Sequence, residues 1–352
     1  MEPIKSLNGT FEGNGYTISN LTLSGSTQDQ AFGLIAQLEG SIRNLQLVDV
    51  QVKPKATKTV YGGALAGSMS GTGEIYRCSV IDSTIVESKT ARIDLTQAGA
   101  NSMAGGLIGE VASGANVTIQ DCLNTTGVKS ALNAGGLIGN ALYAAEITIR
   151  NSVVLGDVEL TNKNGGGIIG LLGSVPVTAS QVYFGGTITG SSKYGFAYNT
   201  AYSSTNKIKA ESVYYNSTKN QGTSYYSPFE PLKKNTVLEG SIGGKSTEEL
   251  KRLGFDGFTA SDKFDGYPVP SWLTTLGAGP HKVTVTAEDA NKVTLTKDGT
   301  TTEMSAGENG VFTASGLAEG LYTYTAEPKL ADKKDTATGR LVVGKVDKAM
   351  TI

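Results

Sequence analysis

A short glycine-rich segment recurs at nearly regular intervals through the first two thirds of the chain. Its copies read FGLIAQLEG (32–40), YGGALAGSM (61–69), AGGLIGEV (104–111), AGGLIGNA (134–141), GGGIIGLL (165–172) and, in degenerate form, YGFAYN (194–199). The marker glycines Gly33, Gly63, Gly106, Gly136, Gly167 and Gly195 follow one another after 30, 43, 30, 31 and 28 residues. A period of this size is typical of repeat proteins in which each copy packs on its neighbours. The feature predicts a solenoid.

A run of alternating apolar and polar residues follows the glycine segments. Ile42, Ile75, Ile119 and Ile149 open four of these runs, which are rich in β-branched residues and carry no capped helical pattern. Strands that recur at this period without helical crossovers cannot form a doubly wound sheet, but they suit a β-helix whose coils pair in parallel. We therefore predict an all-β protein, with a right-handed parallel β-helix of about seven coils.

Glycine is abundant and proline is scarce, with 46 glycines and 9 prolines among 352 residues. This ratio excludes a collagen repeat or a proline-rich linker. We expect the surplus glycines at coil corners, which need a positive φ, and where stacked coils approach too closely for a side chain. A phosphate-binding loop is disfavoured, because the segment repeats and no Gly-Lys-[Ser/Thr] follows it.

Charge and cysteine content argue against several functions. The 30 Lys and Arg against 32 Asp and Glu give a net charge of −2 without a basic block, which disfavours nucleic-acid binding. No apolar stretch reaches the ~20 residues that span a bilayer, so we expect no membrane insertion, and the N-terminus lacks the layout of a signal peptide. One histidine and two cysteines cannot build a zinc finger or an HExxH site. The sequence thus indicates no metal and no cofactor.

The repeat resembles one found in bacterial surface proteins. The Gly-Gly-Leu-Ile-Gly segments, joined by I-x-[ND]-[CS] strands, look like GLUG-motif repeats. LNGTFEGNGYTISNLTL (7–23) is similar to the first coil of such solenoids, and GKSTEELKRLGF with FDGYPVPSWL (244–273) resembles their usual ending. The resemblance covers residues 1–275 and implies an extracellular adhesin-like or scaffolding region, at the cell surface or secreted. GLUG repeats also occur within IgA-cleaving metallopeptidases, whose zinc motif this sequence lacks.

Both ends of the solenoid need a cover, because unpaired strand edges promote aggregation. Ser246 and Glu249 form a capping-box pattern, which predicts a short capping helix over 246–253.

A second domain is expected at 281–352, after a linker at 276–280. Five alternating runs lie at 282–289, 292–299, 310–317, 321–328 and 339–346, and turn residues separate them. This spacing predicts a small antiparallel β-sandwich. SGLAEGLYTYTAEP resembles the late strands of bacterial immunoglobulin-like or carboxypeptidase-regulatory-like modules, which implies a stalk unit. We also expect further domains of a larger surface protein.

Two pairs of residues occupy equal register on neighbouring coils. Cys78 and Cys122 should have Cα atoms about 5 Å apart, which allows a disulfide, although we favour a stacked pair of buried free thiols. Asp49 and Asp82 also align, and a separation of about 5 Å is that of a retaining glycosidase pair. Sugar-binding aromatic residues are missing beside them, so we favour two exposed carboxylates that water screens.

Eight of the 15 tyrosines fall between residues 183 and 226. The candidate ligand-binding residues among them are Tyr194, Tyr198, Tyr202, Tyr225 and Tyr226, because aromatic rings suit sugar and protein surfaces. The alternative is that the rings stack and fill the last coils, as expected if VYF (182–184) aligns with VYY (213–215). A second candidate binding element is the insertion at 86–101, which lengthens one repeat.

The sequence thus favours a non-catalytic, extracellular adhesin-like or surface-display segment that binds a host protein or glycan. The alternatives are a polysaccharide-active β-helix, either a lyase or a glycosidase, and a purely structural stalk.

Overall fold

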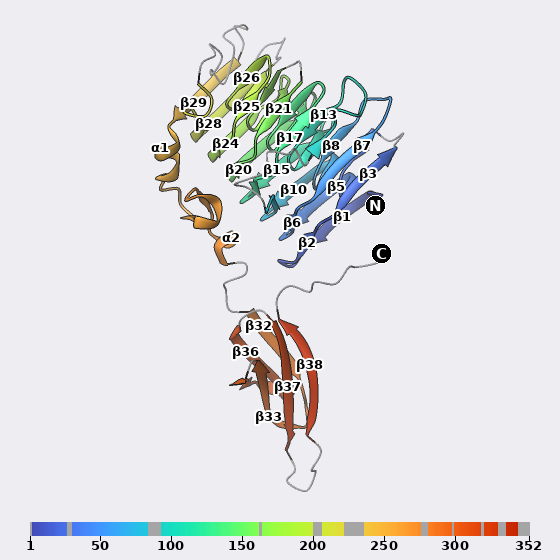
Figure 1. The fold of residues 1–352 in the computed structure, drawn as a ribbon, viewed down its shortest axis with the longest axis vertical. Coiled ribbons are helices and arrows are strands. Elements are labelled where there is room, and N and C mark those ends of the chain that lie inside the picture. Colours follow the sequence, from blue (N-terminus) through green and yellow to red (C-terminus); the bar gives the residue numbers. More distant parts are fainter. Residues whose placement is uncertain are drawn as a thin grey trace. The chain divides into compact units, whose positions relative to one another are not determined.

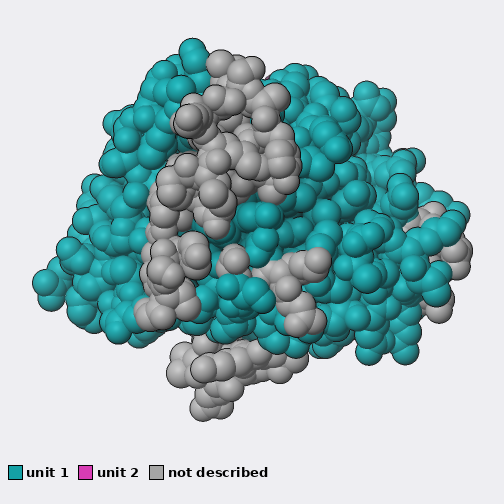
Figure 2. Space-filling model, turned by 90° about the horizontal axis from the view of Figure 1, so that it is seen from above, with its two compact units in different colours: residues 1–271 teal, residues 272–352 magenta. Residues whose placement is uncertain are grey.

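The computed structural model describes residues 2–26, 30–83, 93–161, 164–199, 206–221, 236–275, 281–297, 299–317, 320–329 and 336–343. The chain divides into two compact units, Met1–Ser271 and Trp272–Ile352. Unit 1 is a parallel β-solenoid of about seven turns, as predicted (Figure 1). Figure 2 shows one face of this unit in space-filling form.

The largest sheet has 17 strands, which fall into parallel rows. The longest row contains β1 (Ile4–Glu12), β5 (Ile35–Arg43), β10 (Thr72–Tyr76), β15 (Asn116–Gln120), β20 (Glu146–Val154), β24 (Val177–Phe184), β28 (Asn206–Asn216) and β29 (Thr236–Lys245). A second row continues from β5 into β9 (Ala66–Ser70), β14 (Ile108–Val111), β19 (Ile138–Ala141), β23 (Ile169–Leu172) and β27 (Ala197–Asn199). A third contains β2 (Thr17–Ser19), β6 (Gln46–Val48), β11 (Ser79–Ile81) and β16 (Leu123–Asn124), and it merges into β20.

Two six-stranded parallel sheets complete the coils. One contains β3 (Thr22–Ser26), β7 (Gln51–Lys55), β12 (Ile93–Asp94), β17 (Val128–Ser130), β21 (Val158–Leu160) and β25 (Ile188–Thr189). The other contains β4 (Ala31–Phe32), β8 (Tyr61–Gly63), β13 (Met103–Gly105), β18 (Asn133–Gly135), β22 (Asn164–Gly166) and β26 (Ser192–Tyr194). Each sheet takes one strand from each of six successive coils, so a repeat in the sequence is one coil of the solenoid.

The predicted register of the apolar strand positions is confirmed. Ile75 pairs with Ile42 on one side and with Ile119 on the other, and Ile119 pairs with Ile149. All four side chains are fully buried in one continuous apolar core. Alternation within each run therefore places the same apolar position inside every coil.

The marker glycines are required for close approach between coils. A Cβ at Gly33 would lie 2.5 Å from the carbonyl oxygen of Gly63, and a Cβ at Gly167 would lie 2.5 Å from that of Gly195. Gly136 likewise has no room, because the carbonyl oxygen of Gly167 and the side chain of Val154 occupy the space. The expected positive φ is wrong for these positions, since none of the marker glycines adopts it.

A positive φ occurs at other glycines of the solenoid, such as Gly40, Gly71 and Gly114, and in a column of polar residues at a corner of the coils. Its members are Asn44, Arg77, Asp121, Asn151, Gln181 and Ser212, with φ between 47° and 56°. Asn151 Nδ2 donates to Asp121 Oδ1 at 3.1 Å, and Gln181 Nε2 donates to Asn151 Oδ1 at 2.9 Å. Asn and Asp tolerate this conformation, and the bonds between coils offset its cost. We call this column the corner column.

The predicted capping helix is confirmed, but it covers a flank of the solenoid. Helix α1 (Thr247–Lys251) has the capping box, in which Ser246 Oγ accepts from Glu249 N at 3.2 Å and Glu249 Oε2 accepts from Ser246 N at 2.7 Å. It contacts β28 and β29 (Figure 1), and β31 (Pro268–Pro270) contacts β20. The chain between them also forms β30 (Phe258–Ala260) and a 3₁₀ turn at Asp262–Phe264. We call residues 246–271 the return segment.

The first coil differs from the predicted closed end. Strand β1 pairs with β5, and within the described residues no helix or strand covers its second edge. Its side chains are mostly exposed, and Leu7 and Phe11 are only partly buried against the core. The cover predicted for both ends is thus present beside the last coils and missing from the described part of the first.

Unit 2 begins with a short helix, α2 (Trp272–Thr275), and forms the predicted antiparallel β-sandwich. One sheet has the order β32 (His281–Thr286), β36 (Val311–Leu317), β35 (Ser305–Ala306). The other has the order β34 (Thr300–Glu303), β33 (Ala290–Lys297), β37 (Gly320–Pro328), β38 (Ala337–Val343), and a 3₁₀ turn lies at Glu308–Gly310. Val293, Leu295, Phe312 and Tyr322 belong to the core that the two sheets share. The predicted linker at 276–280 lies outside the described residues.

Candidate functional site

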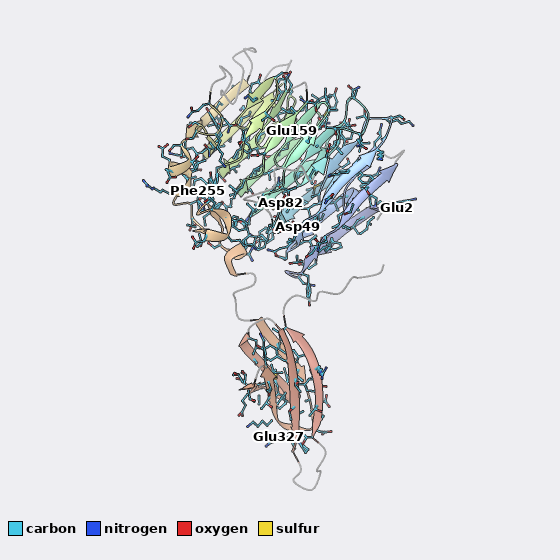
Figure 3. All side chains as sticks on the ribbon, viewed as in Figure 1. Glu2, Asp49, Asp82, Glu159, Phe255 and Glu327 are labelled. Carbon is cyan, nitrogen blue, oxygen red and sulfur yellow. The ribbon has the colours of Figure 1, made fainter. Side chains whose placement is uncertain are left out.

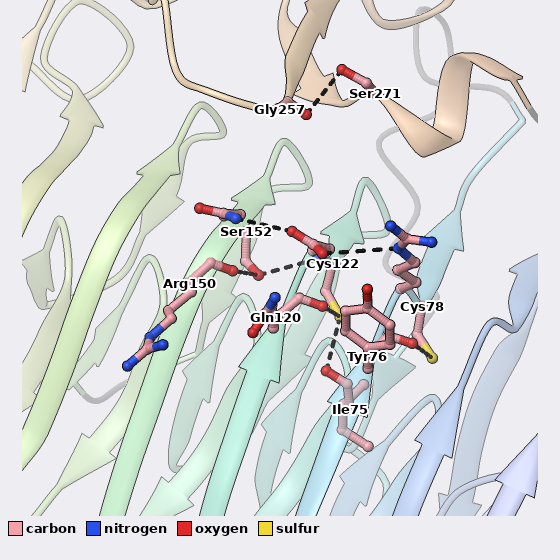
Figure 4. A network of polar contacts seen from close by, with 12 residues as sticks. Ile75, Tyr76, Cys78, Gln120, Cys122, Arg150, Ser152, Gly257 and Ser271 are labelled. Carbon is pink, nitrogen blue, oxygen red and sulfur yellow. Dashed lines mark hydrogen bonds and ion pairs between the residues drawn. The ribbon is translucent and has the colours of Figure 1, made fainter.

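The two cysteines lie on neighbouring coils as buried free thiols (Figure 4). Cys122 Sγ lies 3.4 Å from the carbonyl oxygen of Ile75, and Cys122 N donates to Ser152 Oγ at 3.2 Å. Burial raises the pKa of the Cys78 thiol from 9.0 to about 12, and it raises that of Cys122 well above 9.0. Thiolates are therefore disfavoured here, and both residues fill the core rather than offer a nucleophile.

The aligned carboxylates have different surroundings. Val48 pairs with Ile81, so Asp49 and Asp82 follow them on neighbouring coils (Figure 3). Asp49 accepts hydrogen bonds from the backbone N and the Oγ of Ser83, at 2.9 and 2.5 Å. Asp82 is not exposed as expected, because only 3% of its surface is accessible. The Asp49 carboxylate thus ties one coil to the turn of the next.

The tyrosine-rich flank, which we define as Tyr183, Tyr194, Tyr198 and Tyr214, packs within the molecule. Tyr194 is buried, and its ring stacks on that of Tyr198 with centroids 5.5 Å apart. The predicted alignment of VYF with VYY is confirmed, since Tyr183 pairs with Tyr214. The other three candidates, Tyr202, Tyr225 and Tyr226, lie outside the described residues.

The return segment packs against this flank. The Phe255 ring lies 6.2 Å from that of Tyr183 and 6.1 Å from that of Tyr214, and the Tyr183 hydroxyl donates to the Pro268 carbonyl at 2.5 Å. Burial raises the pKa of Tyr183 well above 10.0. The described tyrosines thus match the stacking alternative more closely than an open binding face.

The insertion is integrated with the coil at its C-terminal half. Residues 84–92 lie outside the description, but Ile93 in β12 pairs with both Val52 and Val128. Leu95 is fully buried, and Gly99 N donates to the Lys58 carbonyl at 2.9 Å. Register places the extra residues on both sides of β12, so this strand interrupts the insertion.

A polar cluster that the sequence analysis missed lies on β5, β9, β14 and β19. Register places Gln37, Ser68, Glu110 and Asn140 side by side, and we call them the Glu110 row. Asn140 Nδ2 donates to Glu110 Oε1 at 3.0 Å, and Ser68 Oγ donates to Glu110 Oε2 at 3.4 Å. Each of these residues lies at the same position of its glycine segment, directly after a small residue that follows two apolar ones, as in LIGE and LIGN. That constant position was the signal in the sequence.

Two members of the Glu110 row have polar atoms that are partly or fully buried. Glu110 is half-buried, and this burial raises its pKa despite the two hydrogen bonds. Asn140 Oδ1 is buried without a hydrogen-bond partner. Unsatisfied buried acceptors are rare and costly, so the row has unused capacity to accept hydrogen bonds.

Two tyrosines lie near the row. The pKa of Tyr61 is raised, mainly because the side chain is partly buried. The charge of Glu110 and, to a smaller extent, that of Tyr143 raise it further. Tyr61 is half-buried, whereas Tyr143 is 69% exposed. The marker glycines carry no side chain to this surface, so they serve the scaffold beneath it.

Comparisons with known proteins give little on function. No family model and no curated protein matches the chain. A solved structure, "a putative immunoglobulin A1 protease" from Bacteroides ovatus, is similar with a TM-score of 0.41 and 16% identity, and the match covers 74% of this chain and 77% of that chain. The described residues contain no cluster of three His, Cys, Asp or Glu that could hold a metal, and no helix among them is long and apolar enough to cross a membrane.

Proposed function

We propose that this chain is a recognition segment of a bacterial surface or secreted protein, and that it acts by binding a host protein or glycan. The observation that carries the proposal is the array of polar side chains held in register on successive coils. The corner column and the Glu110 row both carry hydrogen bonds from coil to coil. Such an array is rigid before a ligand arrives, which lowers the entropy lost on binding.

The chemistry of the aligned groups supports binding rather than catalysis. Asp49 accepts two hydrogen bonds from Ser83, and both thiols have pKa values raised by burial. Groups held in this way stabilise the coil contacts, whereas a nucleophile needs an accessible and ionised form. We further propose that the chain works outside the cell, and that the sandwich of unit 2 is an immunoglobulin-like spacer.

Binding and turnover can be measured together on the full chain. We expect retention of at least one member of a glycan array or a panel of host extracellular proteins, with no change in the mass of the ligand after prolonged incubation. Release of shortened oligosaccharides or peptides would instead assign an enzyme. Failure to retain any member would leave the chain as a purely structural stalk.

A further inference from the structure

We propose that the Glu110 row, together with Tyr61 and Tyr143, binds a glycan that carries no negative charge. This inference rests on the proposed recognition function and names the ligand class and the site. The row supplies acceptors for hydroxyl groups, and the exposed tyrosine supplies a ring for the apolar face of a sugar.

The atoms of the row that can still form hydrogen bonds are acceptors, so they favour a ligand with hydrogen-bond donors. Both carboxylate oxygens of Glu110 already accept one bond each, and each retains a further lone pair. Asn140 Oδ1 adds an acceptor that has no donor. Sugar hydroxyls donate to such groups, whereas a sialic acid or sulfate would meet the Glu110 charge with a like charge.

The aromatic residues define the outer part of the site. Tyr143 exposes 69% of its surface, slightly more than Tyr16 at 64%. Its flat ring can stack on the carbon-bound hydrogens of a sugar, while its hydroxyl stays in water. Tyr61 lies against the residue before Glu110, because a Cβ at Gly109 would be 2.6 Å from the backbone carbonyl carbon of Tyr61. The carbonyl of Tyr143 accepts from Gly114 N at 2.9 Å, four residues after Glu110, so the two tyrosines and the row form one neighbourhood.

The length of the row favours an extended chain rather than a compact ligand. Its members lie on four successive coils, each about 4.8 Å from the next. Gln37, at one end, also lines a pocket of about 170 Å³ with Lys5, Ser6, Ala31 and Ala36. That volume is below the roughly 300–1,000 Å³ of pockets that enclose whole small molecules. The pocket therefore suits one unit of a longer oligosaccharide that continues along the row.

The test compares two variants of the site with two matched controls, all in the full chain. Glu110→Gln and Tyr143→Ala should each weaken binding to neutral oligosaccharides on a glycan array by about tenfold or more. Glu239→Gln, in β29, and Tyr16→Ala, a tyrosine that is 64% exposed, should leave binding unchanged. Unfolding in urea checks that all four variants fold like the parent.

Acidity provides a second readout. Burial raises the pKa of Glu110, so as the pH is lowered this side chain should be protonated at a higher pH than an exposed glutamate. The affinity for the glycan should fall in that pH range. Glu110→Gln should remove that fall. Glycan binding that survives both site variants would overturn this site while leaving the recognition function in place. Preference for sialylated or sulfated glycans would overturn the ligand class, and binding to no glycan would overturn the inference as a whole.

Discussion

The tyrosine-rich flank and the Glu110 row differ in how far apart their residues lie in the sequence. The flank gathers tyrosines within a few tens of residues, yet its described rings pack against each other and against Phe255 of the return segment. The row takes one polar residue from each of four coils, and no stretch of sequence makes it conspicuous. In both regions, residues one period apart meet between coils, as Tyr183 meets Tyr214 and Ser68 meets Glu110. Whether they build the scaffold or form a surface depends on what packs over them.

The largest expected difference between the two regions is in stability. Tyr183→Ala should lower the free energy of unfolding by about 3–5 kcal/mol, because it removes a buried ring and the donor to Pro268. Tyr143→Ala should change it by less than about 0.5 kcal/mol, because that ring is exposed. Urea denaturation of both variants measures the contrast. Equal losses would mean that Tyr143 also belongs to the packed scaffold.

The glycine segment beneath the Glu110 row should give an intermediate effect. Gly136→Ala should destabilise the protein by about 1–3 kcal/mol, because the new methyl group meets the Gly167 carbonyl and the Val154 side chain. Gly254→Ala, in the return segment, meets nothing within 4 Å and should be neutral within about 0.5 kcal/mol. Thermal or urea unfolding distinguishes the two. A neutral Gly136→Ala would show that the coils separate more easily than their spacing implies.

The smallest effect concerns the link between the corner column and the return segment. Gln181 donates to Asn151 and accepts from Asp256 N at 2.7 Å. Gln181→Ala should therefore cost about 1 kcal/mol of stability and increase hydrogen exchange at residues near 256. Gln120→Ala, one register position before the corner column, serves as the control and should leave that exchange unchanged. Unaltered exchange in both variants would mean that the aromatic contacts alone hold the return segment.

Much of the scaffold was predictable from local patterns. The repeat period, the aligned isoleucines and the capping box of Ser246 each depend on residues within one or two coils, and the structure confirms them. The assignment of positive φ to the marker glycines was wrong, because other glycines and the polar residues of the corner column adopt it. A glycine in the sequence indicates a steric constraint. It does not tell whether that constraint is a positive φ or a close approach between coils.

Local patterns in the sequence were enough to predict an all-β solenoid followed by a small sandwich, because strand alternation and repeat length act locally and recur in every coil. Which side chains face outward together depends on how the coils pack in three dimensions. That packing buries Tyr183 under the return segment and places Glu110 between Ser68 and Asn140. The physical reason is that pairing between coils brings together residues about 30 or more positions apart, and burial and charge are then set by those neighbours.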